Sequence, residues 1–232
     1  MALVKLGGGI IQLSGSIAGN TFARNRYGNY MRARTKPTNP RSTQQQAVRA
    51  VIQYLTEYWS ETLSDAERTA WNLYADSVAM KNKLGETTKL SGFNHFIRSN
   101  ATPARLLLPI VKSGPTIFTL PDADTTFAIS ASEATQNITA TFNNTLDWAV
   151  ESGGLLSMLQ GKPQNPQINF FNGPFRFWTA VQGVDPGGAV TPKEAPAVFA
   201  IAEGQKIWVT ARIMRADGRL SEIFRASCTV AA

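Results

Sequence analysis

Acidic side chains are missing from the first 49 residues of the chain, and the first one is Glu57. The same stretch carries eight Lys or Arg, which is more than the formal charge of +7 for the whole chain. Residues 50–232 contain the remaining 15 of the 23 basic groups and all 16 acidic groups, so their formal charge is −1. Because the leader is also rich in Gly, Ser, Asn and Thr, it has too little apolar surface for a core of its own. Its charge favours an acidic partner surface or nucleic acid.

Other shortages exclude whole classes of protein. The single cysteine, Cys228, rules out an internal disulfide framework, and we expect it to act as a small hydrophobe on the last strand. No apolar run reaches the roughly 18 residues that span a bilayer, and no signal peptide opens the chain. We therefore expect a soluble protein made in a reducing cytoplasm.

Catalytic and metal-binding constellations are also lacking. His95 is the only histidine, with no second His or Cys cluster to complete a triad or a metal site, so we expect a surface or capping residue. Asp122 and Asp124 lack the ligand ladder of a calcium loop and are expected to be solvated loop charges. The leader glycines match no phosphate-binding fingerprint. The sequence thus predicts no enzyme, no catalytic or metal residue and no cofactor.

Residues 1–41 have the features of an extended basic arm. Its glycines break helices, because glycine loses the most backbone freedom on ordering. Thr21–Asn25 and Tyr30–Thr35 are predicted to pair as a hairpin, with Gly28 in the turn. A two-stranded ribbon is marginal in water, so the arm needs another surface.

Residues 42–112 are predicted to be helical. Ser42 with Gln45 and Ser64 with Glu67 fit capping boxes, each followed by apolar residues at helical spacing. Ser91 is predicted to cap a third helix that ends at Pro103.

Residues 113–232 are predicted to be strands, which makes the fold class α+β. The clearest unit is the hairpin Lys206–Arg215 and Leu220–Val230 around Asp217-Gly218, with one apolar and one polar face. The number of short strands suits an immunoglobulin- or fibronectin-III-like β-sandwich. The other predicted strands are Thr116–Leu120, Phe127–Ala131, Asn137–Phe142, Trp148–Glu151, Leu155–Gln160 and Arg176–Val181.

Three interpretations of the arm stay open: a strap on neighbouring subunits, a nucleic-acid-binding segment, or a solvated tail. Basic residues interleaved with aromatics suit phosphates and bases. Regular alternation with apolar interruptions suits strand addition to another protein. The candidate partner-binding residues are Ile10, Ile11, Leu13, Ile17, Phe22, Arg24, Arg26, Tyr30, Arg32 and Arg34.

Aromatic residues cluster in 170–178. They are either packed alternately into the core or displayed at a hairpin tip, where they would bind a carbohydrate or a protein. The candidate surface site comprises Phe170, Phe171, Phe175 and Trp178.

Several segments carry a resemblance to known proteins: GSIAGNTFAR at 15–24, KPTNPRSTQQ at 36–45, Arg49, ERTAW at 67–71 and LSGFN at 90–94. This order resembles virion-type structural proteins encoded by bacteriophages and prophages, over roughly the first 100 residues. The resemblance implies a head-decoration, minor capsid or neck protein, located in the virion. Its expected partners are capsid proteins or further copies of itself, with nucleic acid as the alternative and no membrane.

Overall fold

The chain forms a mixed α+β fold with three α-helices and several antiparallel sheets among the described residues. This computed structural model describes residues 2–3, 7–10, 13–25, 28–36, 38–81 and 87–232. The chain divides into two compact units, residues 1–46 and residues 47–232. The helical and strand-rich regions fall in the same unit, and their division near residue 112 stays a prediction.

The first unit is a four-stranded sheet in the order β1-β4-β3-β2. Asn25 pairs with Gly28, so the predicted hairpin exists, but its loop spans two residues instead of four. The turn residues Arg26 and Tyr27 lie outside the described residues. Residues 15–33 are thus a small sheet, whereas the sequence predicted an extended arm with one ribbon, because further strands pair with the free edges of the hairpin. The strands are β1 (Ala2–Leu3), β2 (Gly15–Ile17), β3 (Asn20–Asn25) and β4 (Gly28–Ala33).

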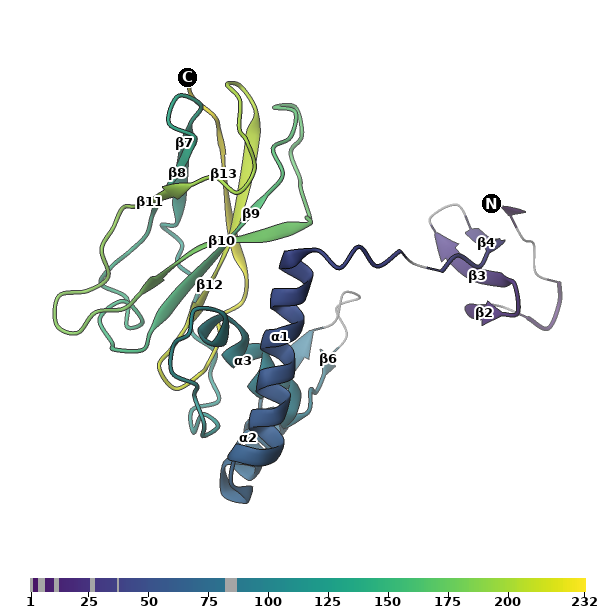
Figure 1. Ribbon diagram of the computed structural model, residues 1–232, viewed down its shortest axis with the longest axis horizontal. Coiled ribbons are helices and arrows are strands. Elements are labelled where there is room, and N and C mark those ends of the chain that lie inside the picture. The colour runs from purple at the N-terminus through teal and green to yellow at the C-terminus, as the bar shows by residue number, and fades with distance from the viewer. Residues whose placement is uncertain (1, 4–6, 11–12, 26–27, 37, 82–86) are drawn as a thin grey trace. The chain divides into compact units, whose positions relative to one another are not determined.

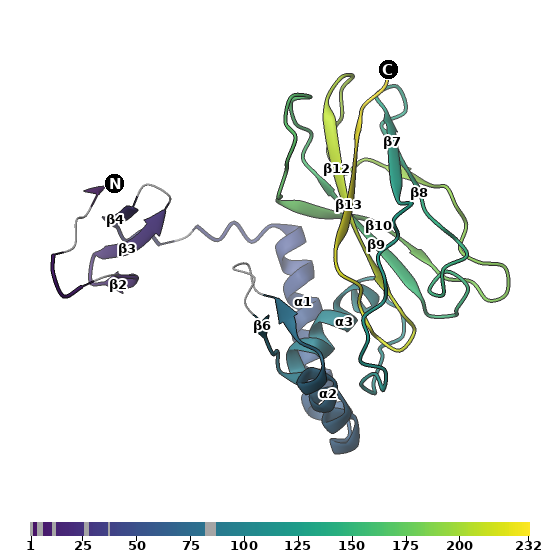
Figure 2. The same cartoon turned by 180° about the vertical axis from the view of Figure 1, so that it is seen from behind.

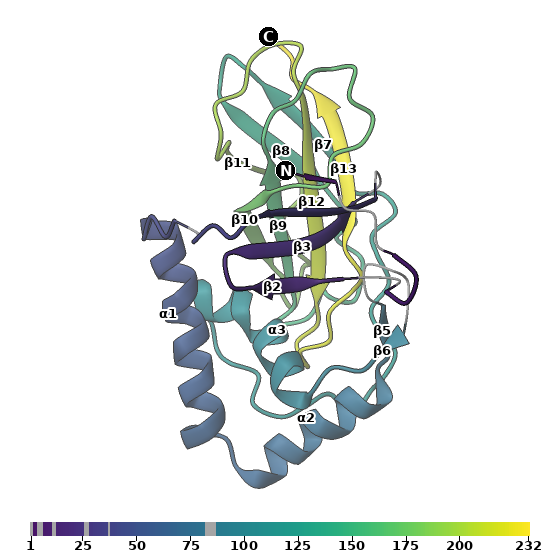
Figure 3. The same ribbon diagram turned by 90° about the vertical axis from the view of Figure 1, so that its right-hand side faces the viewer.

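Three α-helices follow: α1 (Thr43–Glu57), α2 (Asp65–Ser77) and α3 (Gly92–Arg105), with a π-helical turn, Tyr58–Thr62, after α1 (Figure 3). All three predicted helix starts are confirmed. The hydroxyl groups of Ser42 and Ser91 accept backbone hydrogen bonds from the residues three positions later, at 3.4 and 3.3 Å. Ser64 and Glu67 form the full capping box, in which Ser64 N donates to the Glu67 carboxylate at 2.8 Å. These contacts satisfy amides that have no partner within the helix.

Pro103 does not end α3, so that prediction was wrong. The proline lies in the last turn, where its missing N–H removes one intrahelical hydrogen bond, and the helix continues only to Arg105. Leu106 N donates to the carbonyls of Thr102 and Pro103 at 3.1 and 3.0 Å, which closes the turn. Leu107 then takes a φ of 57°, and the helix ends.

The helices share a hydrophobic cluster around Trp71. Its indole N–H donates to the carbonyl of Lys112 at 2.8 Å, and its ring meets Phe96 edge-on at 5.8 Å. Asn100 is fully buried and bonds both the N–H and the carbonyl of Val111. These bonds hold the segment that follows α3, and that leads to the strands, against the helix. A short hairpin, β5 (Met80–Lys81) with β6 (Thr87–Thr88), lies beside this region.

Two further sheets form the rest of the second unit (Figure 1). The larger has the order β10-β9-β12-β13 and the smaller the order β11-β8-β7. Apolar residues of both sheets join one buried cluster that includes Ile138, Met158 and Val209. At one side β13 lies next to β7, and Ala231 N donates to the Ala131 carbonyl at 2.9 Å (Figure 2). The strands are β7 (Ala128–Ser132), β8 (Asn137–Thr141), β9 (Leu155–Gly161), β10 (Phe175–Gln182), β11 (Lys193–Pro196), β12 (Lys206–Met214) and β13 (Phe224–Thr229).

Two predicted strands are absent and one strand was missed. Residues 148–151 form a turn that buries Trp148 against Phe142, so their apolar character serves the core without strand pairing. Residues 116–120 are irregular, and the Thr119 carbonyl accepts from Arg219 Nη1 at 2.9 Å. Strand β11 is polar and contains a proline, a combination that only an edge strand tolerates.

The Asp-Gly hairpin is confirmed between β12 and β13. Gly218 has a φ of 92°, which the turn requires and glycine adopts without strain. Val209, Ala211 and Ile213 face the core as predicted. The opposite face was expected to be open to solvent, but it is partly covered: Trp208 is only 3% exposed and packs on the ring of Phe171 at 5.7 Å.

Candidate functional site

In the sheet of the first unit, the strand register places Ile17, Phe22 and Met31 on one face, called here the apolar face although Asn20, Arg24 and Asn29 also lie on it. Phe22 pairs with Met31 on one side and with Gly15 on the other, so these residues share a face with Ile17. The other face carries Ser16 and Thr21, whose hydroxyl oxygens lie 2.8 Å apart, with Tyr30 and Arg32.

No residue of this unit whose exposure the structure describes is buried, and the first described residue that is buried is Leu55. Ile17 is 67% exposed and Ile10 is 53% exposed, while Phe22 and Met31 are half-buried. Neither buried hydrophobic cluster of the chain contains a described residue before 47. The described part of this sheet thus has hydrogen-bonded strands without a buried cluster, and isolated small sheets are marginal in water.

The unit also carries the whole excess charge of the chain. Residues 1–46 contain seven Lys or Arg and no acid, and residues 47–232 contain 16 of each sign. Arg24 lies on the apolar face and Arg32 on the polar one, because Arg24 pairs with Asn29 and Arg32 with Thr21. The described arginines of the strands are therefore split between the two faces.

The predicted partner-binding residues fall partly within this sheet. The structure brings Ile17 and Phe22 onto one face and places Tyr30 and Arg32 on the other. Ile10 and Leu13 lie between β1 and β2, and Arg34 follows β4, where its N–H donates to the Gly19 carbonyl at 2.8 Å. Ile11 and Arg26 lie outside the described residues.

The predicted aromatic site is divided between two faces of the larger sheet. Trp178 is 8% exposed, belongs to the core cluster and donates to the Pro196 carbonyl at 3.0 Å. Phe171 and Phe175 pack together at 5.4 Å on the other face. Phe170 is 65% exposed, and the guanidinium of Arg225 lies 5.0 Å from its ring centroid. The four residues do not form one surface.

His95 was predicted at the surface, and that was wrong: its side chain is 3% exposed and meets the Tyr74 ring edge-on at 5.1 Å. The local sequence gave no sign of this, because the tertiary contact with α2 buries the ring. Burial lowers the pKa of His95, and the charge of Arg98 adds to the effect.

The prediction that Asp124 is a solvated loop charge was also wrong. Asp124 is 5% exposed and accepts hydrogen bonds from Thr126 and from Asn143 N, so it fixes the loop, whereas Asp122 is exposed. Cys228 packs against the core cluster as predicted, and burial raises its pKa to about 11. Among the described residues no group of His, Cys, Asp or Glu is arranged to hold a metal ion.

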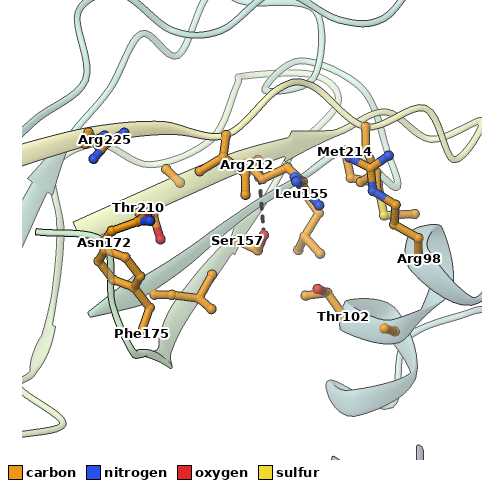
Figure 4. A pocket seen from close by; sticks show the side chains of 15 residues that line it. Arg98, Thr102, Leu155, Ser157, Asn172, Phe175, Thr210, Arg212, Met214 and Arg225 are labelled. Carbon is orange, nitrogen blue, oxygen red and sulfur yellow. Dashed lines mark hydrogen bonds between the residues drawn. The ribbon is translucent and has the colours of Figure 1, made fainter. Parts of the chain in front are cut away.

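A groove that the sequence did not predict lies on the outer face of the larger sheet (Figure 4). Its volume is about 620 Å³, and it opens between strands β9, β10 and β12 and helix α3. Three arginines line it, from three different elements: Arg98 on α3, Arg212 on β12 and Arg225 on β13. Alternation along β12 gives the reason: the core residues point inward, so Thr210 and Arg212 point outward.

Comparison with known proteins gives little guidance. No protein-family model and no curated protein matches this sequence. One solved structure that matches is a family 76 glycoside hydrolase from a bovine Bacteroides thetaiotaomicron strain, at 12% identity and a TM-score of 0.31. The match covers 47% of this chain and 20% of the hydrolase, and a likeness this weak carries no argument.

The helices can also be compared with the requirements for crossing a membrane. None of the helices in the described part of the chain combines the length and the apolar character needed to cross a bilayer.

Proposed function

We propose that this protein is a structural component of a bacteriophage particle, such as a head-decoration, minor capsid or neck protein. It binds neighbouring subunits through the sheet of residues 1–46. Those neighbours are capsid proteins or further copies of the chain itself, in a symmetric homo-oligomer. The segment resemblance described above supplies the phage context, and the sheet supplies the mechanism.

The observation that carries this proposal is a sheet whose described residues are nowhere buried. Ile17, Phe22 and Met31 line one face of it, and no described helix or strand before residue 42 covers them. Burying a large apolar side chain contributes about 1.5–3 kcal/mol. A neighbour that covers this face therefore supplies the stabilisation that the unit lacks, and β2 offers a free sheet edge for strand addition.

Nucleic-acid binding is the alternative, and the charge of the first unit is the observation that favours it. Seven cations without an acid would neutralise phosphates and release counterions. The register argues against it, because Arg24 and Arg32 lie on opposite faces and make no continuous track along the sheet.

The two-sheet part of the second unit fits the same proposal. Seven short strands with a shared core are what an immunoglobulin- or fibronectin-III-like β-sandwich requires. We assign the unit to that class and the protein to the virion. Sandwich domains are suited to display on an assembly, since their loops gather at two ends while the core holds the shape.

The test compares two double variants of the full chain. Ile17→Asp with Phe22→Asp places charge on the apolar face, and Arg24→Ala with Arg32→Ala removes two cations. We expect the first pair to abolish incorporation and the second to reduce it modestly. The measurement is mass spectrometry of purified phage particles from the strain that encodes the protein.

Circular dichroism provides the control, because neither pair touches the buried clusters and both should leave the second unit folded. An equal or larger loss from the arginine pair, with affinity for DNA that falls steeply with salt, would establish nucleic-acid binding instead. Absence of the wild-type chain from purified particles would refute the virion assignment outright.

A further inference from the structure

Arg212 lies in the middle of the groove, between Arg98 at one end and Arg225 at the other (Figure 4). Its Nε is buried and has no hydrogen-bond partner among the described residues. Burial, together with the neighbouring charge of Arg98, lowers the pKa of Arg212 to about 10. A guanidinium held in this way is destabilising, because desolvation of a charge is costly without a counter-charge.

Arg98 also has no carboxylate partner among the described residues. The acceptor of its Nη1 is the Met80 sulfur at 3.2 Å, and sulfur is a weak acceptor. Burial lowers the pKa of Arg98 as well. The third arginine, Arg225, donates a long bond of 3.4 Å to the Phe171 carbonyl. The described residues that line the groove include no Asp or Glu.

Two other arginines of the same unit, both outside the groove, are paired with carboxylates. Arg215 bonds both oxygens of Glu151, at 2.7 and 3.0 Å, and hydrogen bonding to Glu151 raises its pKa. Arg219 is 7% exposed and meets the Asp217 carboxylate at 2.7 Å.

We propose that this groove binds an acidic peptide segment of a partner protein, with an Asp or Glu carboxylate held by Arg212 and Arg98. A guanidinium takes up a carboxylate through two parallel hydrogen bonds, and the pair would supply the missing counter-charge. Leu155, Leu159 and Phe175 form the apolar wall, which suits an apolar side chain next to the acid. The volume of about 620 Å³ is within the range of ligand-binding clefts.

Two other occupants fit less well. The first 46 residues of a second copy carry seven cations and no acid, so the arginines would repel them. Nucleic acid needs a continuous cationic track, whereas residues 47–232 carry 16 groups of each sign. The site therefore differs from the sheet of the first unit, and the inference does not depend on the proposed function.

The experiment uses the full chain and a labelled peptide that alternates Leu and Glu, with its Leu-Gln counterpart as the neutral probe. Fluorescence anisotropy should show binding of the Glu peptide only, weakening as salt is added. Arg212→Met should reduce that affinity at least about tenfold, because one partner of a buried charge pair is lost. Arg176→Met, at an exposed arginine outside the groove, is the matched control and should leave affinity unchanged.

Thermal unfolding gives an independent readout. Removing an unpaired buried charge should raise the midpoint of Arg212→Met by about 2–4 °C. Arg98→Met repeats both measurements at the second arginine, in case the first variant does not fold. A lower midpoint in both folded variants would mean that the arginines support the fold and would overturn the proposal.

Three further results would also overturn it. Equal binding of the Leu-Gln peptide would show that the groove recognises the apolar side chains and not the carboxylates. Displacement of the Glu peptide by inorganic phosphate or by oligo-dT at comparable concentration would make it a phosphate site. Self-association of the wild-type chain in light scattering, lost in Arg212→Met, would make a second copy the occupant.

Discussion

Residues 47–232 bury two hydrophobic clusters, one around Trp71 and one around Val209, whereas the described residues of 1–46 bury none. The charge is distributed in the opposite way: the first unit carries the whole formal +7, and the second is neutral. Both units contain well-registered antiparallel strands. Strand pairing is thus common to both, and the difference lies in whether a core accompanies it. Hydrogen bonds define the shape of a sheet, but burial supplies most of its stability.

The largest expected difference between the two units is in the free energy of local opening. Without a core, the first unit should open with little free energy, so trypsin should cleave after Arg24, Arg32 and Arg34 in the free chain. Cleavage after Arg212 or Arg219 should be slower by orders of magnitude, because opening there requires loss of the core. Limited digestion followed by mass spectrometry gives both rates. Comparable rates at the two sets of sites would mean that the first unit is as stable as the second.

A matched pair of truncations compares the units energetically. Trp71→Ala removes a side chain that is 0% exposed, and we expect the free energy of unfolding to fall by about 3–5 kcal/mol. Phe22→Ala removes a half-buried ring from the first unit and should cost no more than about 0.5 kcal/mol in the free chain. Urea denaturation followed by far-UV circular dichroism measures the two changes, since residues 1–46 contain no tryptophan. Similar losses would show that Phe22 belongs to a cooperative core.

The smallest effect concerns pH and should be confined to the second unit. Since burial keeps the pKa of His95 below 6.5, the unfolded chain takes up its proton first as the pH falls. The stability from neutral His95 is complete above about pH 6.5 and declines as the pH drops toward the folded pKa. Urea midpoints between about pH 7.5 and 5.5, where carboxylates stay ionised, should decrease for the wild type. His95→Gln should flatten that slope; an unchanged slope would assign it to other groups.

Local signals in the sequence located most elements of the second unit. The Ser caps of three helices and the Asp-Gly turn are short-range chemistry, and the structure confirms each of them. Predictions failed where partners are distant. Residues 148–151 resemble a strand but bury Trp148 from a turn, and β11 is polar yet pairs with β8 at an edge.

For the functional surfaces, the sequence supplied residue types but not their grouping. It located the cationic leader and its apolar residues, yet only the register shows that Ile17 and Phe22 share a face while Arg24 and Arg32 do not. The aromatic cluster was noted as one set, and strand alternation separates Trp178 from Phe175. The arginine groove gave no sequence signal, because Arg98 and Arg212 are more than a hundred residues apart.

The sequence by itself determined the charge asymmetry, the α+β class, the helix caps and the central hairpin, since each depends on composition or on residues within a few positions of one another. The tertiary structure alone decided which polar groups are buried. The sequence neighbours of His95, Asp124 and Arg212 do not indicate which partners each side chain meets. Packing leaves His95 without a partner for Nε2, gives Asp124 the donors Thr126 and Asn143, and leaves Arg212 facing a groove without a counter-charge. The physical reason is that the cost of burying a polar group depends on the partners that the fold brings to it.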